Sequence, residues 1–348
     1  VARKRVTFAS TVIYNDFREG SITVSRGCQA IRIRVLQGIR SGLSGWCSRG
    51  SPPGRHPTLY NQGGRTATIV NRPNPPQSPI TVFQPFDSTD VRGQMLVLGT
   101  GTSIGVPVVG CGCDTCTSTD PRNNRTRCGL VLGLPDGNLL VDTPPDLRTQ
   151  LLREKVGIVH ATLFTHDHAD HVFGLDDLRL FPYFLGHAMP IYCEDQVESR
   201  IRKSFDYAFT PEASTYGGGV PQIEFRPIAE EPFDVLSQRV TPIRLNHGRF
   251  RVLGFRFGNV AYCTDTNEIP AESWPLLEGL DVLVLDALRH KPHPTHFSLS
   301  EAIDVAQRLG AKRTYFTHMS HDLEHAATNA ALPEGMELAY DGLRIPLT

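Results

Sequence analysis

Four side chains that can bind a metal ion crowd into six residues of this sequence. The run His-Asp-His-Ala-Asp-His at 166–171 offers His166, His168, Asp170 and His171, directly after an apolar stretch. Imidazole and carboxylate groups are the ligands that Zn²⁺ and similar divalent cations take up. Two His at i and i+2 do not share a helix face, whereas in an extended loop both can point the same way. Asp170 and His171 can then turn to a second point as a helix begins, so the segment predicts a site for two cations.

Two cations need more than four ligands, and the sequence supplies three further candidates. His247, Asp265 and His318 each follow a short apolar run that we predict to be a strand. Loops at the ends of rigid strands are where α/β scaffolds place their chemistry. The shared placement of the three residues indicates that they converge on the same site.

Short apolar runs alternate with helical patterns after residue 94, which predicts an α/β layered fold. Ser298 is placed as an N-cap with Glu301 in a capping box, and Gly310 as the end of the same helix. The expected strands are 95–98, 129–134, 139–142, 161–165, 240–245, 260–264, 282–286 and 314–317, and the expected helices are 146–154, 196–207 and 300–309.

The net charge of −1 conceals two parts of opposite sign. Residues 1–93 carry 13 Lys and Arg against 4 Asp and Glu, a balance of +9, and residues 94–348 carry 22 against 32, a balance of −10. Pro, Gly, Ser and Arg recur in 1–93, so we expect a disordered basic leader, with strand-like patches only at 21–25 and 31–35. A basic arm for nucleic acid is the alternative. The chain begins with Val and Met95 opens the first convincing strand, so the leader could also come from an over-long gene model.

The composition also bears on the compartment. No run of about 18 apolar residues occurs, which excludes a transmembrane helix, and the first thirty residues lack the apolar core of a secretory signal. Eight cysteines in 348 residues do not make a disulfide scaffold. We therefore expect a cytoplasmic protein in a reducing environment and no membrane partner.

The motif Thr165-His-x-His-x-Asp-His, followed by isolated His247, Asp265 and His318, resembles the metallo-β-lactamase superfamily over essentially all of 94–348. The resemblance implies an αββα sandwich with a dinuclear site at one edge, preceded by the leader at 1–93. By matching position, one metal is bound by His166, His168 and His247, the other by Asp170, His171 and His318, and Asp265 bridges them. The resemblance also implies an early Asp that supports the ligand loop. Asp142 matches it, with Asp146 as the competing choice.

A closer resemblance is to the PhnP type of phosphodiesterase. It rests on Gly99-Thr-Gly-Thr-Ser-x-Gly105, followed by Cys111, Cys113 and Cys116. The resemblance implies a separate structural zinc, held by these three cysteines and His321. Three thiolates and one imidazole make a closed tetrahedral zinc site. A homodimer is a further implication of the resemblance.

One more His is a candidate for substrate chemistry. The PhnP type carries a His shortly before its last helix, and His296 matches its spacing to His318. It would lie near the substrate phosphate as a general acid or anion binder. His293 remains the rival, and Asp286 and Arg289 are candidates to orient this loop.

The expected function is a metal-dependent hydrolase, most specifically a phosphodiesterase for a small cyclic ribose-type phosphodiester. Two cations, Zn²⁺ or Mn²⁺, lower the pKa of a shared water and polarise a phosphoryl oxygen. Asp170 and Asp265 orient the nucleophile, and His296 protonates the leaving alkoxide. The acidic body disfavours long polyanions, so nucleic acid is the less favoured partner.

Two alternatives use the same fold and metals. A tRNA 3′-processing-type endoribonuclease usually shows a long Gly- and Pro-rich arm, and the stretch 209–221 is too short for one, although it could cap a pocket. A lactone or thioester hydrolase is the other alternative, and the cysteine cluster favours it less. A metal-binding module that binds RNA without hydrolysing it would not need the full ligand set.

Overall fold

The computed structural model describes two units of the chain, Val1–Phe83 and Gln84–Thr348. In the first unit it describes the backbone of four strands, and in the second residues 88–210 and 219–347. The strands of the first unit are β1 (Arg5–Phe8), β2 (Thr11–Asp16), β3 (Ser21–Arg26) and β4 (Gln29–Arg34).

These four strands pair in chain order into an antiparallel sheet. Two of them, β3 and β4, agree with the strand-like patches expected at 21–25 and 31–35. The sequence did not predict β1 and β2, with which they form the sheet. The rest of the expected disordered leader, up to residue 87, lies outside the described residues, as does most of the 209–221 stretch.

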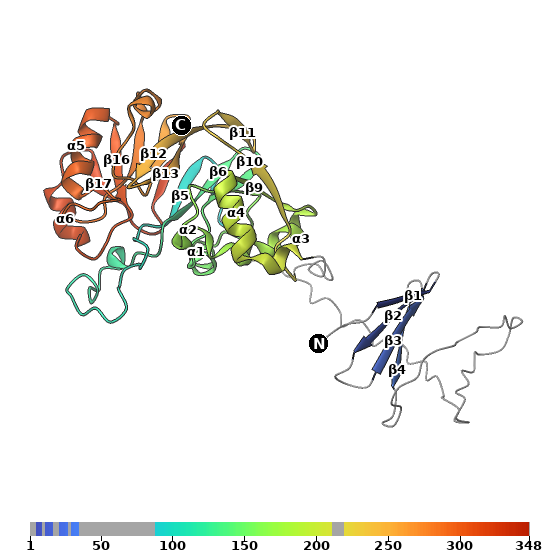
Figure 1. The fold of residues 1–348 in the computed structure, drawn as a ribbon. Helices are drawn as coiled ribbons and strands as arrows, with labels where there is room; N and C mark the ends of the chain where they lie inside the picture. Colours follow the sequence, from blue (N-terminus) through green and yellow to red (C-terminus); the bar gives the residue numbers. More distant parts are fainter. Residues whose placement is uncertain are drawn as a thin grey trace, which may run out of the picture. The chain divides into compact units, whose positions relative to one another are not determined.

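The second unit is built on two seven-stranded sheets (Figure 1). The first sheet has the order β10 (Ile223–Pro227), β9 (Met189–Cys193), β8 (Ala161–Leu163), β7 (Gly137–Val141), β6 (Gly129–Leu134), β5 (Gln94–Gly99) and β18 (Arg344–Pro346). The second has the order β11 (Phe233–Val235), β12 (Gln238–His247), β13 (Phe250–Phe257), β14 (Val260–Cys263), β15 (Val282–Asp286), β16 (Arg313–Thr317) and β17 (Met336–Leu338).

Helices cover the outer faces of both sheets, which confirms the expected αββα sandwich. The helices are α1 (Leu147–Glu154), α2 (Ala169–Val172), α3 (Phe181–Leu185), α4 (Asp195–Ser204), α5 (Leu299–Leu309) and α6 (His325–Ala331). Side chains alternate between faces along a strand, and β5 shows the result. Met95 and Val97 point into the core between the sheets, while Leu96 and Leu98 pack against the helices outside. Both faces of the central strands are therefore apolar, as in the expected buried strands.

Helix α5 has the ends that the sequence predicts. Ser298 accepts a hydrogen bond from the backbone of Glu301, whose side chain bonds back to the Ser298 backbone, and Gly310 ends the helix in a left-handed conformation. No helix among the described residues is both long enough and apolar enough to cross a membrane.

The packed body begins slightly before residue 94. Val91 is buried, and Arg92 forms a bridge to Gly133 of β6. A lone Val among polar residues carries no periodic signal, so the sequence could not include it in the body.

The strands that carry the candidate ligands end at the same place. Strand β7 runs parallel to β8, and β14, β15 and β16 run parallel to one another. Carboxyl ends of parallel strands meet at one sheet edge, where α/β proteins place their sites. Three residues there, Asp142, Asp265 and His318, adopt positive φ angles of 62°, 53° and 60°. Non-glycine residues adopt this conformation at a cost that concentrates at functional sites.

Candidate metal centre

The structure brings the seven predicted ligands into two groups that share one carboxylate. The donor atoms in each group lie within 4.8 Å of one another. The first group is His166, His168, His247 and Asp265, and the second is Asp170, His171, Asp265 and His318. Four of the residues come from one loop and short helix, 166–171, while His247 comes from β12 and the others follow β14 and β16.

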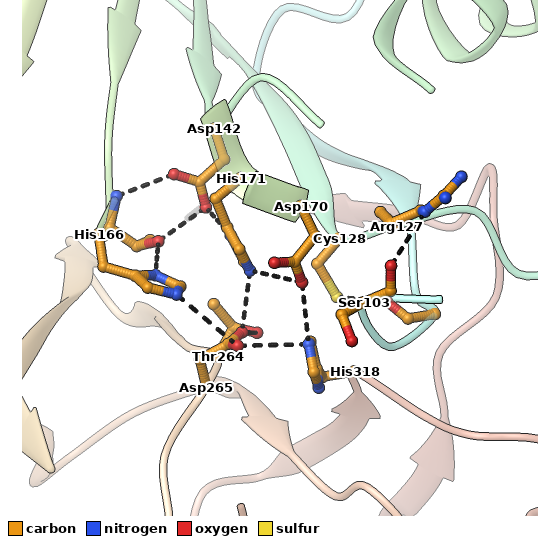
Figure 2. A network of polar contacts seen from close by, with 12 residues as sticks. Ser103, Arg127, Cys128, Asp142, His166, Asp170, His171, Thr264, Asp265 and His318 are labelled. Carbon is orange, nitrogen blue, oxygen red and sulfur yellow. Dashed lines mark hydrogen bonds and ion pairs between the residues drawn. The ribbon is translucent and has the colours of Figure 1, made fainter. Parts of the chain in front are cut away.

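Asp265 occupies the middle of the cluster (Figure 2). Its Oδ1 lies 3.3 Å from His171 Nε2 and its Oδ2 lies 3.3 Å from His318 Nε2. The same Oδ2 is 3.9 Å from His166 Nε2 and 4.0 Å from His247 Nε2. The carboxylate therefore faces both groups of donors, which is the geometry of a bridging ligand.

Several of these donors are buried without a hydrogen-bond partner. This holds for Nε2 of His166, Nε2 of His171 and both ring nitrogens of His318. A buried polar atom without a partner is costly. Imidazole nitrogens and carboxylates are also the donor types of zinc and manganese sites. The residues present thus fit two divalent cations.

The charges of the cluster agree with this interpretation. Burial alone would lower the pKa of His318, but the Asp265 and Asp170 carboxylates raise it to about 9. Burial, reinforced by the neighbouring His171, holds the pKa of His166 well below its ordinary value. The carboxylates attract positive charge, and the His166 ring stays neutral, as a metal ligand must be.

Three of the candidate ligand His side chains are held at Nδ1 by a hydrogen bond, so that Nε2 faces the site. His171 Nδ1 lies 2.8 Å from Asp142 Oδ2. His166 Nδ1 lies 2.9 Å from the Thr165 hydroxyl. His247 Nδ1 lies 2.6 Å from a backbone oxygen, that of Thr295. Such partners fix the tautomer and the direction of the ring.

The structure separates the two candidates for the carboxylate that supports the ligand loop. Asp142 is fully buried and accepts hydrogen bonds from the backbone N–H and the hydroxyl of Thr165, at 2.9 and 2.8 Å. The backbone N–H of Thr165 is thus used by a side chain, and β8 ends at Leu163 rather than at the expected residue 165. Asp146 instead precedes α1 and accepts two bonds from the Arg127 guanidinium, at 2.9 and 3.1 Å.

His296, rather than His293, faces the cluster. It is 8% exposed, its ring stacks on His318 with centroids 4.5 Å apart, and its centroid is 4.6 Å from that of His247. Its Nδ1 lies 2.7 Å from Asp286 Oδ2. His293 is half-buried and contacts Thr295. Of the loop residues named from the sequence, Asp286 orients His296, while Arg289 donates to carbonyls of its own loop.

The four residues named for a structural zinc also come together. Sγ of Cys111 and of Cys113 lies 3.3 Å from His321 Nδ1, and Sγ of Cys116 lies 3.6 Å away. Zinc bonds of tetrahedral geometry place sulfur and nitrogen ligands about 3.5 Å apart. The backbone N–H of Cys116, and then the Cys111 side chain, lower the pKa of Cys113 to about 6, which favours its metal-binding thiolate form. The spacing fits one zinc ion.

Two contacts of the site were missed by the sequence reasoning. Thr165 carries a hydroxyl that links His166 to Asp142; the sequence placed Thr165 at the start of the motif but gave it no role. Phe250 lies beside His168, with ring centroids 5.5 Å apart. Its position opposite His247 across the turn at 248–249 was the signal available, since hairpin partners share a face.

Known proteins agree with this architecture. The family described as Beta-lactamase superfamily domain matches residues 137–319, more than half of the chain. The solved structure of a new diphosphatase from the PhnP family is 43% identical, covers 72% of this chain and 96% of that one, and superposes with a TM-score of 0.68. Zn²⁺-bound PqqB from Methylobacterium extorquens shares the fold at 19% identity and a TM-score of 0.62, covering 73% of this chain and all of that one.

A curated relative is the octanoyltransferase of Porphyromonas gingivalis, 36% identical over 252 residues, or 71% of this chain. The chain spans half the length of that relative and 40% of a second, the coenzyme PQQ synthesis protein B of Methylorubrum populi. The family match, the fold and the donor cluster lead to the same conclusion. The chain belongs to the metallo-β-lactamase superfamily, a family of metal-dependent hydrolases, and is a PhnP-like member of it.

Proposed function

We propose that the chain is a phosphodiesterase that hydrolyses a small, cyclic ribose-type phosphodiester and uses two divalent cations, Zn²⁺ or Mn²⁺. The observation that carries the proposal is the pair of donor groups sharing Asp265, with His296 stacked at their edge. The likeness to a diphosphatase of the PhnP family, at 43% identity, supports chemistry at phosphorus.

The ligands would be divided as the two groups are. His166, His168 and His247 would hold one cation, Asp170, His171 and His318 the other, and Asp265 would bridge them. When bound, such a pair supplies an activated water and neutralises charge on the phosphoryl oxygens. A third, structural zinc would be held by Cys111, Cys113, Cys116 and His321.

Two side chains of the protein would then orient the attacking water and donate a proton to the leaving group. Asp170 lies at the exposed side of the cluster, with Oδ2 3.4 Å from His171 Nε2 and 3.7 Å from His318 Nε2. It would accept a hydrogen bond from the attacking water and orient it. His296 is held at Nδ1 by Asp286, so its Nε2 is free to donate a proton to the leaving alkoxide.

A diphosphate diester is the second candidate substrate, since the diphosphatase relative is the observation that favours it. Attack at phosphorus and protonation of a leaving oxygen are common to both reactions. The leaving group differs, because a phosphate needs less help from an acid than an alkoxide does. His296 therefore matters more for the cyclic diester than for the diphosphate.

Hydrolysis by the full chain of a substrate panel tests the proposal. The panel holds a ribose 1,2-cyclic phosphate, a 2′,3′-cyclic nucleotide, a diphosphate diester, a lactone and a precursor tRNA. We expect metal-dependent turnover of the cyclic phosphates, its loss in Asp170→Ala, and a fall of 100-fold or more in His296→Asn. His293→Asn is the matched control and should retain activity. Turnover of the lactone or the RNA alone would overturn the substrate class.

A further inference from the structure

The carboxylate of Asp265 is held by a neighbour that is not itself a candidate ligand. Thr264 Oγ1 donates a hydrogen bond to Asp265 Oδ1 at 2.7 Å, and the two side chains lie together in the cluster (Figure 2). Thr264 is 0% exposed and Asp265 is 2% exposed. A hydrogen bond from a hydroxyl to a carboxylate is roughly twice as strong as one between neutral groups. The bond therefore restrains the carboxylate that the two donor groups share.

The two oxygens of the Asp265 carboxylate have different surroundings. Oδ1, which accepts the hydrogen bond from Thr264, lies 3.3 Å from His171 Nε2 of the second donor group. Oδ2 lies 3.3 Å from His318 Nε2 of the second group and 3.9 Å from His166 Nε2 of the first. Oδ2 is thus the oxygen that faces both groups, while Oδ1 faces one group and the Thr264 hydroxyl.

The backbone around Asp265 is anchored on both sides. Before it, β14 ends at Cys263 and is paired with β13 and β15. After it, the Thr266 N–H donates to Asp286 Oδ2 at 3.0 Å, and the Thr266 hydroxyl donates to the carbonyl of Asn246 at 2.9 Å. Because the backbone is fixed, rotation of the carboxylate about its own side-chain bonds is the main freedom that remains. The hydroxyl of the preceding residue acts on that rotation.

We propose that Thr264 is a positioning residue of the metal centre, which holds Oδ1 of Asp265 so that Oδ2 serves both cations. The inference rests on the proposed function, because it assumes a pair of cations that shares this carboxylate. Without the hydroxyl, Asp265 can turn both oxygens toward the cation of the second group, to which Oδ1 is already close. The cation of the first group then keeps only its three His ligands. Loss of an outer partner of this kind costs about 10- to 100-fold in metal affinity.

Binding of Mn²⁺ to the metal-depleted full chain tests this role. Mn²⁺ suits the nitrogen and oxygen donors of the cluster, whereas the thiolates of the cysteine site select zinc. The free Mn²⁺ is measured by electron paramagnetic resonance during the titration. Thr264→Val keeps the shape of the side chain and removes the hydroxyl. It should bind one Mn²⁺ as the unchanged chain does and the other about 10- to 100-fold more weakly. Thr264→Ala should give the same result, and Thr264→Ser, which keeps the hydroxyl, should restore the second site.

Thr162→Val is the matched control. Thr162 of β8 is also 0% exposed, and its hydroxyl has no hydrogen-bond partner among the residues that the structure describes. The same chemical change at this position removes no hydrogen bond, so both Mn²⁺ affinities should stay as they are in the unchanged chain.

The spectrum of the loaded protein gives a second readout, because an oxygen shared by two Mn²⁺ ions couples their electron spins. Weaker coupling in Thr264→Val, with recovery in Thr264→Ser, supports the positioning role. Equal weakening of both sites in Thr264→Val, or the same change in Thr162→Val, overturns it, since either result indicates a general loss of structure. If the chain binds two Mn²⁺ and shows the Thr264 effect but hydrolyses no phosphodiester, the proposed function is wrong and the role of Thr264 stands.

Discussion

A single substitution at Asp142 is expected to weaken metal binding by both donor groups. It contacts His171 of the second group directly, at 2.8 Å. It also accepts from the Thr165 hydroxyl, which in turn lies 2.9 Å from His166 Nδ1 of the first group. Asp142 thus orients one His in each group without being a metal ligand.

The substitution Asp142→Asn keeps the side-chain volume but replaces one acceptor oxygen with an NH₂ group that donates hydrogen bonds. An amide NH₂ facing His171 Nδ1 favours the tautomer that carries its proton on Nε2, the nitrogen that faces the site. Loss of such an outer partner costs 10- to 100-fold in metal affinity, or about 1.4–2.7 kcal/mol. The amide nitrogen cannot accept the hydrogen bond that the Thr165 hydroxyl now donates to Asp142 Oδ2. The metal-free fold should therefore lose about 1–3 kcal/mol of stability, which the denaturation curves separate from the loss in metal affinity.

The assay is a competition titration of the full chain against a chromophoric zinc chelator, with urea denaturation of the metal-free protein beside it. Asp146→Asn is the matched control, because Asp146 lies four residues away and pairs with Arg127. The cysteine site gives an internal reference, since Asp142 does not touch it. We expect zinc to leave the active-site cluster at least 10-fold more readily in Asp142→Asn only.

Two results would refute the reasoning. Equal weakening in Asp146→Asn would mean that general charge near the loop, rather than the contacts to His171 and Thr165, governs the affinity. Unchanged affinity in Asp142→Asn would mean that ring orientation does not limit metal binding.

Three other changes have outcomes that the structure predicts. Cys113→Ser should release one zinc per chain and lower the Tm, because it removes a thiolate 3.3 Å from His321; unchanged zinc content by elemental analysis would contradict the structural-zinc site. Arg125→Met should lower the urea-derived stability by about 3 kcal/mol, since Arg125 is 1% exposed and donates to the carbonyls of Ser320 and Leu323; a smaller loss than in a surface Arg variant would contradict this. Burial, followed by two nearby Arg, lowers the pKa of His325 to about 4. In the unfolded chain His325 has its ordinary pKa of about 6.5, so as the pH falls the unfolded chain binds a proton before the folded protein does. The stability that His325 contributes is therefore full above pH 6.5 and falls by up to about 3 kcal/mol as the pH drops to 4. Urea denaturation of His325→Gln at several pH values should show a smaller dependence of stability on pH.

Most of the fold could be predicted because its local and long-range signals agree. The central strands are apolar on both faces, so a simple apolar run marks them. Helix α5 carries a complete capping box and a glycine end, and both ends of the helix occur where the sequence places them. Val91 and strands β1 and β2 lacked such signals, since a lone apolar residue or a short mixed run does not specify a partner.

For the site, too, the residue types could be predicted from the sequence, whereas the contacts between the residues could be predicted only in part. The residues that converge on the candidate site could be named in advance, because few other roles need His, Asp and His so close together after a strand. The partners that orient them were only partly readable. Asp142 and Asp146 are both carboxylates near the end of one strand, and what separates them is the left-handed backbone at Asp142, which turns its side chain back toward Thr165.

Phe250 marks the limit of what the pattern could provide. A Phe after Gly-Arg in a hairpin is an ordinary strand residue in sequence, and its apolar character predicts burial. Its exposure arises because the register pairs it with His247, the last residue of β12, so that it shares the open edge with the metal ligands. Pairing between strands is a tertiary property, and a shift by one residue would send the ring to the opposite face. The candidate ligands can therefore be named from residue types, whereas the neighbours that pack against them depend on strand register.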